Sequence, residues 1–178
     1  MLIDESGILM APLVRRTWAP CGKTPVLYQR TRSHEKISMI AALTVPPKRK
    51  RVGLYFSLHY SNITAKLVTR FLRNLSRQIQ KPLVVIWDSF RPHKAKSVQK
   101  FLRRNKKIHV FYLPAYAPEL NPTEFFWSYL KNNPLSNYPT YDLTTLGTVA
   151  RYHASRIKRK HNLLKSFLYA TPLFLRPK

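Results

Sequence analysis

The feature that most constrains the fold is the order in which apolar runs and helical segments follow one another. Residues Leu83–Trp87 form a short apolar run, and residues Ile108–Tyr112 form another. Between them, Pro92 opens a segment whose apolar side chains recur at helical spacing. A strand, a helix and a second strand in this order predict parallel strands with the helix packed against the sheet. The pattern therefore predicts an α/β fold.

Three further strand-like segments come earlier in the chain. Residues 36–45 are almost continuously apolar, which is typical of a strand buried on both faces. Residues 52–58 alternate apolar side chains with others, which predicts a strand with one buried face. Residues 1–4 are interpreted as the end of a short strand, followed by a turn at Ser6 and Gly7. The short connections among these segments favour antiparallel pairing.

Helical spacing recurs in the segments that separate and follow the strands. The first helix is expected over residues 63–80 with Ser61 or Asn62 as its cap, and the last over about 143–168. The resulting order is strand, strand, strand, helix, strand, helix, strand, helix. This order predicts a ribonuclease H-like fold, a mixed five-stranded sheet flanked by helices. A basic loop or irregular hairpin, near residues 15–32, is inserted after the first strand.

Another helix start stands out within residues 113–127. Asn121 suits an N-cap, Pro122 suits the first helical position, and Glu124 has the spacing of a capping-box partner. Taken alone, Glu124 would need no role beyond this cap. Asp88 would likewise be explained as a turn residue after a buried strand, and Asp4 as an ordinary acid before a turn.

The joint placement of these three acids favours a metal site instead. Asp4 ends the first predicted strand, Asp88 ends the fourth, and Glu124 opens the helix after the fifth. In the predicted topology the first and fourth strands are parallel neighbours, so the three carboxylates meet at one sheet edge. Two like charges about 4 Å apart repel by roughly 4 kcal/mol at an effective dielectric of about 20, so the cluster calls for cations. Hard oxygen ligands select Mg²⁺ or Mn²⁺, and two such ions promote attack on a phosphodiester.

The charge balance indicates the partner. The 178 residues include 32 Lys and Arg but 7 Asp and Glu, a formal net charge of +25, which points to a polyanion and above all to nucleic acid. We expect no membrane association and a cytoplasmic location, because the sequence shows neither an apolar run of about 18 residues nor a signal-peptide pattern. The single Cys21 excludes an internal disulfide and a cysteine-based zinc site.

Four motifs, spread over nearly the whole chain, carry a family resemblance. They are Asp4-Glu5-Ser6-Gly7, Arg15-Arg16-Thr17-Trp18-Ala19-Pro20 with Gly22-Lys23-Thr24-Pro25, Trp87-Asp88 with His93-Lys94-Ala95-Lys96, and Leu113-Pro114-x-Tyr116-x-Pro118-Glu119-Leu120-Asn121-Pro122-x-Glu124-x-x-Trp127. Together they resemble the DDE catalytic domain of insertion-sequence transposases in the Tc/mariner superfamily. The 35 residues between Asp88 and Glu124 (89–123) also suit the family spacing. The resemblance implies that Asp4, Asp88 and Glu124 form the metal-binding triad.

The resemblance also implies a function and its partners. A chain of this kind cleaves DNA and transfers the 3′ end in DNA transposition. Its expected partners are transposon ends and target DNA, and it is expected to act as a homodimer near the prokaryotic nucleoid. The alternative is an impaired fragment that only binds DNA, because the first strand looks short; another ribonuclease H-like nuclease fits the motifs less well. We expect one domain over 1–178, with a core to about 132 and a helical extension over 133–178. The family's helix-turn-helix domain is expected to be absent or to reside on a separate polypeptide.

The basic and aromatic residues near the motifs are candidates for DNA contacts. The candidates are Arg15, Arg16, Trp18, Lys23, His93, Lys94 and Lys96. His93 begins a helix, where histidine is more often structural, and Trp127 is expected to anchor the core rather than to stack on a base. Glu5 and Glu119 are expected to support the site from outside or to face solvent.

Overall fold

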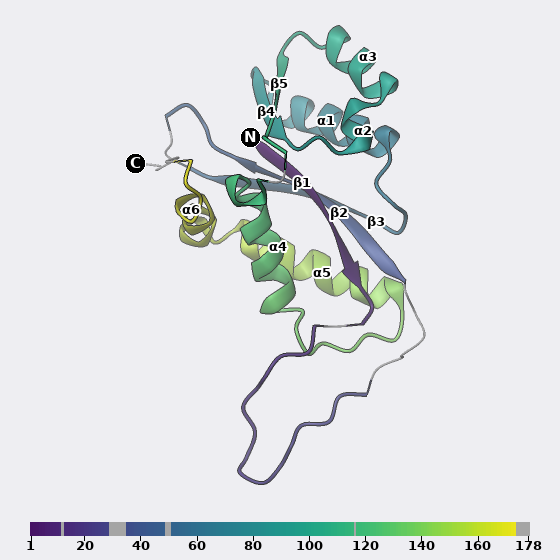
Figure 1. Cartoon of the computed structure of the whole chain (residues 1–178), viewed down its shortest axis with the longest axis vertical. Helices are drawn as coiled ribbons and strands as arrows, with labels where there is room; N and C mark the ends of the chain where they lie inside the picture. The colour runs from purple at the N-terminus through teal and green to yellow at the C-terminus, as the bar shows by residue number, and fades with distance from the viewer. Residues whose placement is uncertain (12, 29–34, 49–50, 116, 174–178) are drawn as a thin grey trace.

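The computed structural model describes residues 1–11, 13–28, 35–48, 51–115 and 117–173, and it shows one five-stranded sheet with helices on both faces (Figure 1). The strands are β1 (Leu2–Leu9), β2 (Lys36–Thr44), β3 (Gly53–His59), β4 (Leu83–Trp87) and β5 (Ile108–Tyr112). The helices are α1 (Ala65–Ile79), α2 (Arg91–Lys94), α3 (Lys96–Arg104), α4 (Thr123–Asn132), α5 (Leu143–Lys158) and α6 (His161–Tyr169), with a 3-10 turn at Pro118–Leu120.

The sheet has the mixed topology that the element order predicts. Its strand order is β3-β2-β1-β4-β5. β1 and β3 are antiparallel to β2, whereas β4 is parallel to both β1 and β5. The prediction that the first and fourth strands are parallel neighbours is therefore confirmed. This pairing places a strand from the start of the sequence beside a strand from its middle, near the centre of the sheet.

β1 is longer than its sequence suggests, and the predicted turn at Ser6 and Gly7 is wrong. The strand continues to Leu9, and all eight of its residues pair with β2. Gly7 causes no turn because β2 presents a continuous antiparallel ladder, which keeps the backbone extended. Asp4 pairs with Ala41 and lies inside the strand rather than at its end.

β2 separates two apolar cores, one on each face of the sheet. Met39 and Ala41 belong to the core beneath α4, α5 and α6, whereas Ile40 and Ala42 belong to the core beneath α1 and α3. All four side chains are fully buried, as their continuous apolar run predicts. α5 and α6 complete the first core, so the segment after residue 132 packs directly on the sheet.

Several helix boundaries differ from the prediction. α1 begins at Ala65, and its cap is Thr64, whose Oγ1 accepts a hydrogen bond from the Leu67 backbone at 3.4 Å; Ser61 and Asn62 are not its caps. The helix opened by Pro92 is interrupted at Ala95, whose backbone is extended, and becomes α2 and α3.

The predicted helix over 143–168 consists of two helices. α5 ends at Lys158 and α6 begins at His161. Lys160, with φ −91° and ψ 81°, leaves the helical conformation and redirects the chain, so that α6 packs against both α4 and α5. No helix in the described part of the chain is long and apolar enough to cross a membrane.

Residues 13–28, which come between β1 and β2, extend away from the sheet (Figure 1). Residues 13–28 form neither helix nor strand, and all of them are exposed. The Asn137 side chain anchors the segment, because it accepts from the Arg15 backbone N–H at 2.7 Å and donates to the Arg15 carbonyl at 2.8 Å. The predicted hairpin is not found in residues 13–28, and residues 29–34 lie outside the described part.

Candidate active site

One pocket, here called the acidic pocket, contains the three acids singled out by the sequence. Asp4 from β1, Asp88 just after β4 and Glu124 in the first turn of α4 all line it. Its volume is about 400 Å³. The remaining wall comes mainly from the segment after β5 and includes Leu113, Pro114, Ala115, Ala117, Pro118 and Asn121. The parallel β1–β4 pair and the return of the chain after β5 thus gather carboxylates from distant positions.

Asp4 is held in a buried position. Its side chain is 8% exposed, and its Oδ2 accepts a hydrogen bond from Trp127 Nε1 at 2.9 Å. Burial, together with the negative charges of Glu124 and Glu5, raises the pKa of Asp4 to about 8. Trp127 is a core anchor, as predicted, since it is 2% exposed. Its second role, that of orienting Asp4, was not predicted.

α4 is fastened to β1 by two polar side chains at its start. Asn121 Nδ2 donates to the Ile3 carbonyl at 3.3 Å, and Thr123 Oγ1 donates to the Leu2 carbonyl at 3.1 Å. Both side chains are buried, so these bonds replace contacts with water. They fix the start of α4 beside the strand that carries Asp4.

The predicted capping box is half formed. Asn121 Oδ1 does accept from the Thr123 backbone N–H at 3.2 Å, as a cap would. The Asn121 backbone N–H, which a capping box would direct to Glu124, donates instead to the Pro118 carbonyl at 2.9 Å. The side chain of Glu124 therefore stays exposed at the pocket rather than folded back on the helix start.

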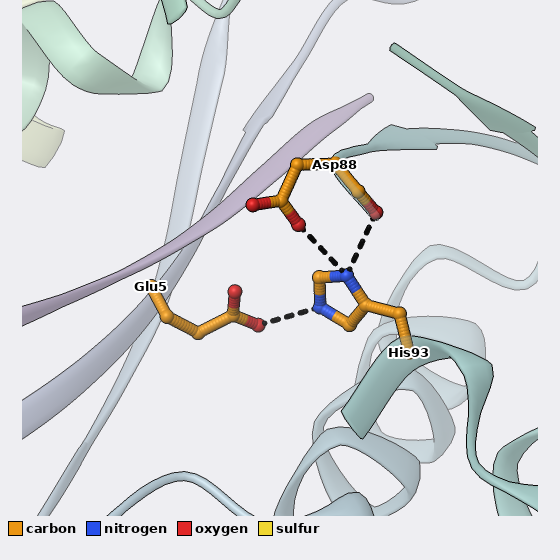
Figure 2. A group of neighbouring side chains, drawn as sticks. All are labelled: Glu5, Asp88 and His93. Carbon is orange, nitrogen blue, oxygen red and sulfur yellow. Dashed lines mark hydrogen bonds and ion pairs between the residues drawn. The ribbon is translucent and has the colours of Figure 1, made fainter. Parts of the chain in front are cut away.

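On the other side of Asp88, a histidine bridges two acids (Figure 2). His93 Nε2 lies 3.0 Å from Glu5 Oε1, and His93 Nδ1 lies 3.1 Å from Asp88 Oδ1. Burial acts to lower the pKa of His93, but the hydrogen bonds with Asp88 and Glu5 outweigh it and raise the pKa to about 9. The imidazolium then donates from both nitrogens. Its ring also stacks on Trp87, with centroids 4.0 Å apart.

These contacts decide between the alternative roles that the sequence left open for two residues. His93 is 0% exposed, so the prediction that it contacts DNA is wrong for this conformation. Of the two roles expected for Glu5, support of the site from outside is the one found: its side chain is 10% exposed and pairs with His93, which in turn contacts Asp88. The sequence does hold a signal for this pair. Adjacent strand residues point to opposite faces, so Asp4 reaches α4 while Glu5 reaches α2.

Asp88 belongs both to the pocket with Asp4 and Glu124 and to the cluster with His93 and Glu5. Its Oδ1 accepts from the Phe90 backbone N–H at 3.0 Å as well as from His93. The hydrogen bond with His93 is the main reason that the pKa of Asp88 lies below its ordinary value. Asp88 is therefore ionised at neutral pH, whereas Asp4 is largely protonated.

The site has two potential sets of metal ligands. Within the described residues, the group whose ligand atoms all lie within 4.8 Å of one another is Glu5, Asp88 and His93. Ion pairing already accounts for that group, because both His93 nitrogens face carboxylates. Asp4, Asp88 and Glu124 are more widely spaced around the pocket and offer hard oxygen ligands of the kind that Mg²⁺ and Mn²⁺ prefer.

The other predicted DNA contacts lie on the surface. The exposed residues of this set are Arg15, Arg16, Trp18, Lys23, Lys94 and Lys96. Trp18 is completely exposed and so is free of any core role. Arg15, Arg16, Trp18 and Lys23 belong to the extended segment after β1, whereas Lys94 and Lys96 flank the junction of α2 and α3.

Comparison with known sequences identifies one family. A family model described as DDE superfamily endonuclease matches residues 1–146. The 39 kDa protein of insertion element IS630 from Shigella sonnei is 28% identical over 89 residues, which make up 48% of this chain and 26% of that protein. The chain thus matches about a quarter of this relative.

Comparison with solved structures identifies the fold. The Mos1 transposase in a paired-end complex with the left transposon end has a TM-score of 0.70 at 16% identity, covering 98% of this chain and 52% of that one. The catalytic domain of the Mos1 mariner transposase has a TM-score of 0.65 at 14% identity, covering 96% and 76%. The chain spans about half the length of the Mos1 transposase. At these identities the likeness establishes the ribonuclease H-like fold.

Proposed function

The chain belongs to the DDE superfamily endonucleases, and we propose that it is a transposase catalytic domain that cuts DNA with divalent metal ions and joins the freed 3′ ends to target DNA. The observation that carries this proposal is the convergence of Asp4, Asp88 and Glu124 on one pocket. We further propose that residues 1–178 form one catalytic domain, with residues 133–178 as its helical extension.

Asp4, Asp88 and Glu124 would hold the metal, which we propose to be two Mg²⁺ or Mn²⁺ ions. The residues fit, because all three offer carboxylate oxygens and because Asp4 has a pKa of about 8 in the absence of a cation. A cation in the pocket would take the place of that proton. When bound, two ions supply an activated water or 3′-hydroxyl and stabilise the leaving oxygen.

The chain's own residues orient these acids before any ligand arrives. Trp127 fixes Asp4 by its indole N–H, and His93 together with the Phe90 backbone fixes Asp88. Asn121 and Thr123 hold the start of α4, and with it Glu124, against β1. Such preorganisation reduces the rearrangement needed when substrate and metal bind.

DNA is the proposed partner, in the form of transposon ends and target. The net charge of +25 and the exposed Arg15, Arg16, Lys23, Lys94 and Lys96 support phosphate contacts around the acidic pocket. Trp18 is proposed to stack on a base. We also propose a homodimer on DNA and a place at the prokaryotic nucleoid.

The alternative, a fragment that binds DNA without cutting it, loses its main support. It depended on a first strand too short to position Asp4. β1 has eight residues and pairs fully with β2, and Asp4 is buried and bonded to Trp127. The structure therefore offers no reason for Asp4 to be misplaced.

The test compares two acid-to-amide substitutions. Asp88→Asn should abolish the Mg²⁺- or Mn²⁺-dependent nicking and joining of labelled DNA while leaving DNA binding intact. Glu119→Gln removes the same charge from an exposed residue of the neighbouring 3-10 turn and should leave cleavage near the wild-type rate. Equal activity of Asp88→Asn and wild type would overturn the site assignment. Calorimetry with Mg²⁺ should show stoichiometric binding, whereas a DNA-binding remnant would show none.

A further inference from the structure

A second charged feature lies between α1 and α3, apart from the acidic pocket. It is a groove of about 570 Å³, here called the basic groove. Two cations from α1, Arg73 and Arg77, line it together with Lys100 and Arg104 from α3. The rest of the lining consists of Phe101 and of four small polar residues, Thr69, Ser76, Ser97 and Asn105.

The cations of the basic groove have no acidic partners. The sequence contains no Asp or Glu over residues 36–87 or over residues 89–118, so neither helix can supply one. Within the described residues, none of the four cations takes part in an ion pair. The Arg73 guanidinium instead lies over the Phe101 ring, 5.7 Å from its centroid. Four like charges along one groove repel one another and favour the binding of an anion.

We propose that the basic groove is a second DNA-binding site, which holds backbone phosphates at a distance from the reacting phosphodiester. The identity of the partner rests on the proposed transposase function. The α1 lining runs from Thr69 to Arg77 and the α3 lining from Ser97 to Asn105. Each stretch extends about 12 Å at about 1.5 Å per residue, which matches three or four nucleotides at about 3.4 Å per strand.

The chemistry of the groove suits a phosphate backbone rather than base edges. Arginine, lysine and small hydroxyl or amide side chains are the usual contacts to phosphate oxygens, and they read no sequence. The groove therefore adds affinity and orientation without adding specificity. It would let DNA of any sequence, such as target or flanking DNA, bind to this helical layer.

The end of the groove that carries Arg77 and Arg104 lies at the opposite end of the strands from the acidic pocket. Arg77 and Arg104 lie in the last turns of α1 and α3, which lead by short connections into the starts of β4 and β5. Asp88 comes directly after the end of β4. A strand of five residues extends about 16 Å. DNA bound at this end of the groove is thus a stretch other than the one being cut.

The test compares two double variants on the same helices. Arg77→Gln/Arg104→Gln removes two groove cations, and Arg70→Gln/Arg103→Gln removes two exposed arginines that do not line the groove. Binding of a labelled DNA duplex is measured over a range of KCl concentrations. For the groove variant, the slope of log K against log salt should become shallower by about 1.8, about 0.9 for each lost phosphate contact. The control should change the slope by less than half as much.

The possible outcomes separate the two proposals. Equal slopes for the two double variants, or no change in the groove variant, would overturn the groove as a site while leaving the transposase function untouched. Wild-type protein that neither binds nor cleaves DNA would overturn both. Circular dichroism checks that the variants fold, and if the double variant is unstable, Lys100→Gln serves with an expected change of about 0.9.

Discussion

The acidic pocket and the basic groove both gather like charges, but they differ in burial. Asp4 in the pocket is 8% exposed and is bonded to Trp127, whereas Arg73, Arg77 and Arg104 in the groove are exposed. Charges interact strongly where water is excluded and weakly where it is not. The pocket is therefore expected to lower the stability of the metal-free protein markedly, and the groove only slightly. Neutralising each cluster in turn tests this difference.

The largest effect is expected from Asp4→Asn in EDTA. The unfolded carboxyl ionises near pH 4, whereas the folded one has a pKa of about 8, so folding at pH 7 requires proton uptake. At about 1.4 kcal/mol per pH unit, the substitution should raise the free energy of unfolding by about 4 kcal/mol at pH 7 and by almost nothing at pH 4. The asparagine Oδ1 still accepts from Trp127. Urea unfolding at the two pH values measures the gain.

The same variant should also lose its response to metal. Mg²⁺ should stabilise the wild type, because it binds the folded carboxylates, and should have little effect on Asp4→Asn. Activity should fall by about 100-fold or more, since a lost charge contact to the transition state is worth about 2.7 kcal/mol or more. A variant that is destabilised in EDTA at pH 7 would show that Asp4 is ionised without a cation, contrary to the burial argument.

His93→Gln should give the next largest effect, with the opposite sign. The folded pKa of His93, about 9, exceeds its unfolded value of 6.5, so its charge stabilises the fold fully below pH 6.5. That stabilisation, on the order of 3 kcal/mol, is lost as the pH rises from 6.5 to 9. The difference in unfolding free energy between wild type and variant should therefore shrink over this window. Urea titrations in EDTA measure it.

His109→Gln is the matched control for this experiment, because His109 is exposed on β5. The free energy of unfolding of the His109→Gln variant should change with pH as that of the wild type does. A difference between wild type and His93→Gln that stays constant from pH 6.5 to 9 would mean that His93 acts through packing against Trp87 alone, not through its charge.

Much of this site was accessible from the sequence, because local patterns determine which segments are strands and helices. The apolar runs that became β4 and β5, and the order of the elements, were enough to place Asp4 beside Asp88. The length of β1 was not accessible. Ser6 and Gly7 favour a turn locally, and only their pairing in the ladder with Met39 and Ser38 of β2, far away in the sequence, keeps them extended.

The supporting contacts of the acids were missed for a related reason. Trp127 and Asp4 are 123 positions apart, and His93 and Glu5 are 88 apart. Sequence spacing shows which residues share a face of one element, but not how an element rotates against its neighbour. The Trp127 indole and the His93 imidazole reach Asp4 and Glu5 because α4 and α2 lie on opposite faces of the sheet.

The smallest effect is expected from Arg77→Gln/Arg104→Gln in the absence of DNA. Removing repulsion among exposed cations should raise the free energy of unfolding by about 0.2 to 0.5 kcal/mol at low salt. The gain should disappear near 1 M salt, where the Debye length is about 3 Å. Arg70→Gln/Arg103→Gln should gain less, because these arginines lie outside the groove. A gain in the groove variant as large as that of Asp4→Asn would show that burial does not set the difference between the two clusters.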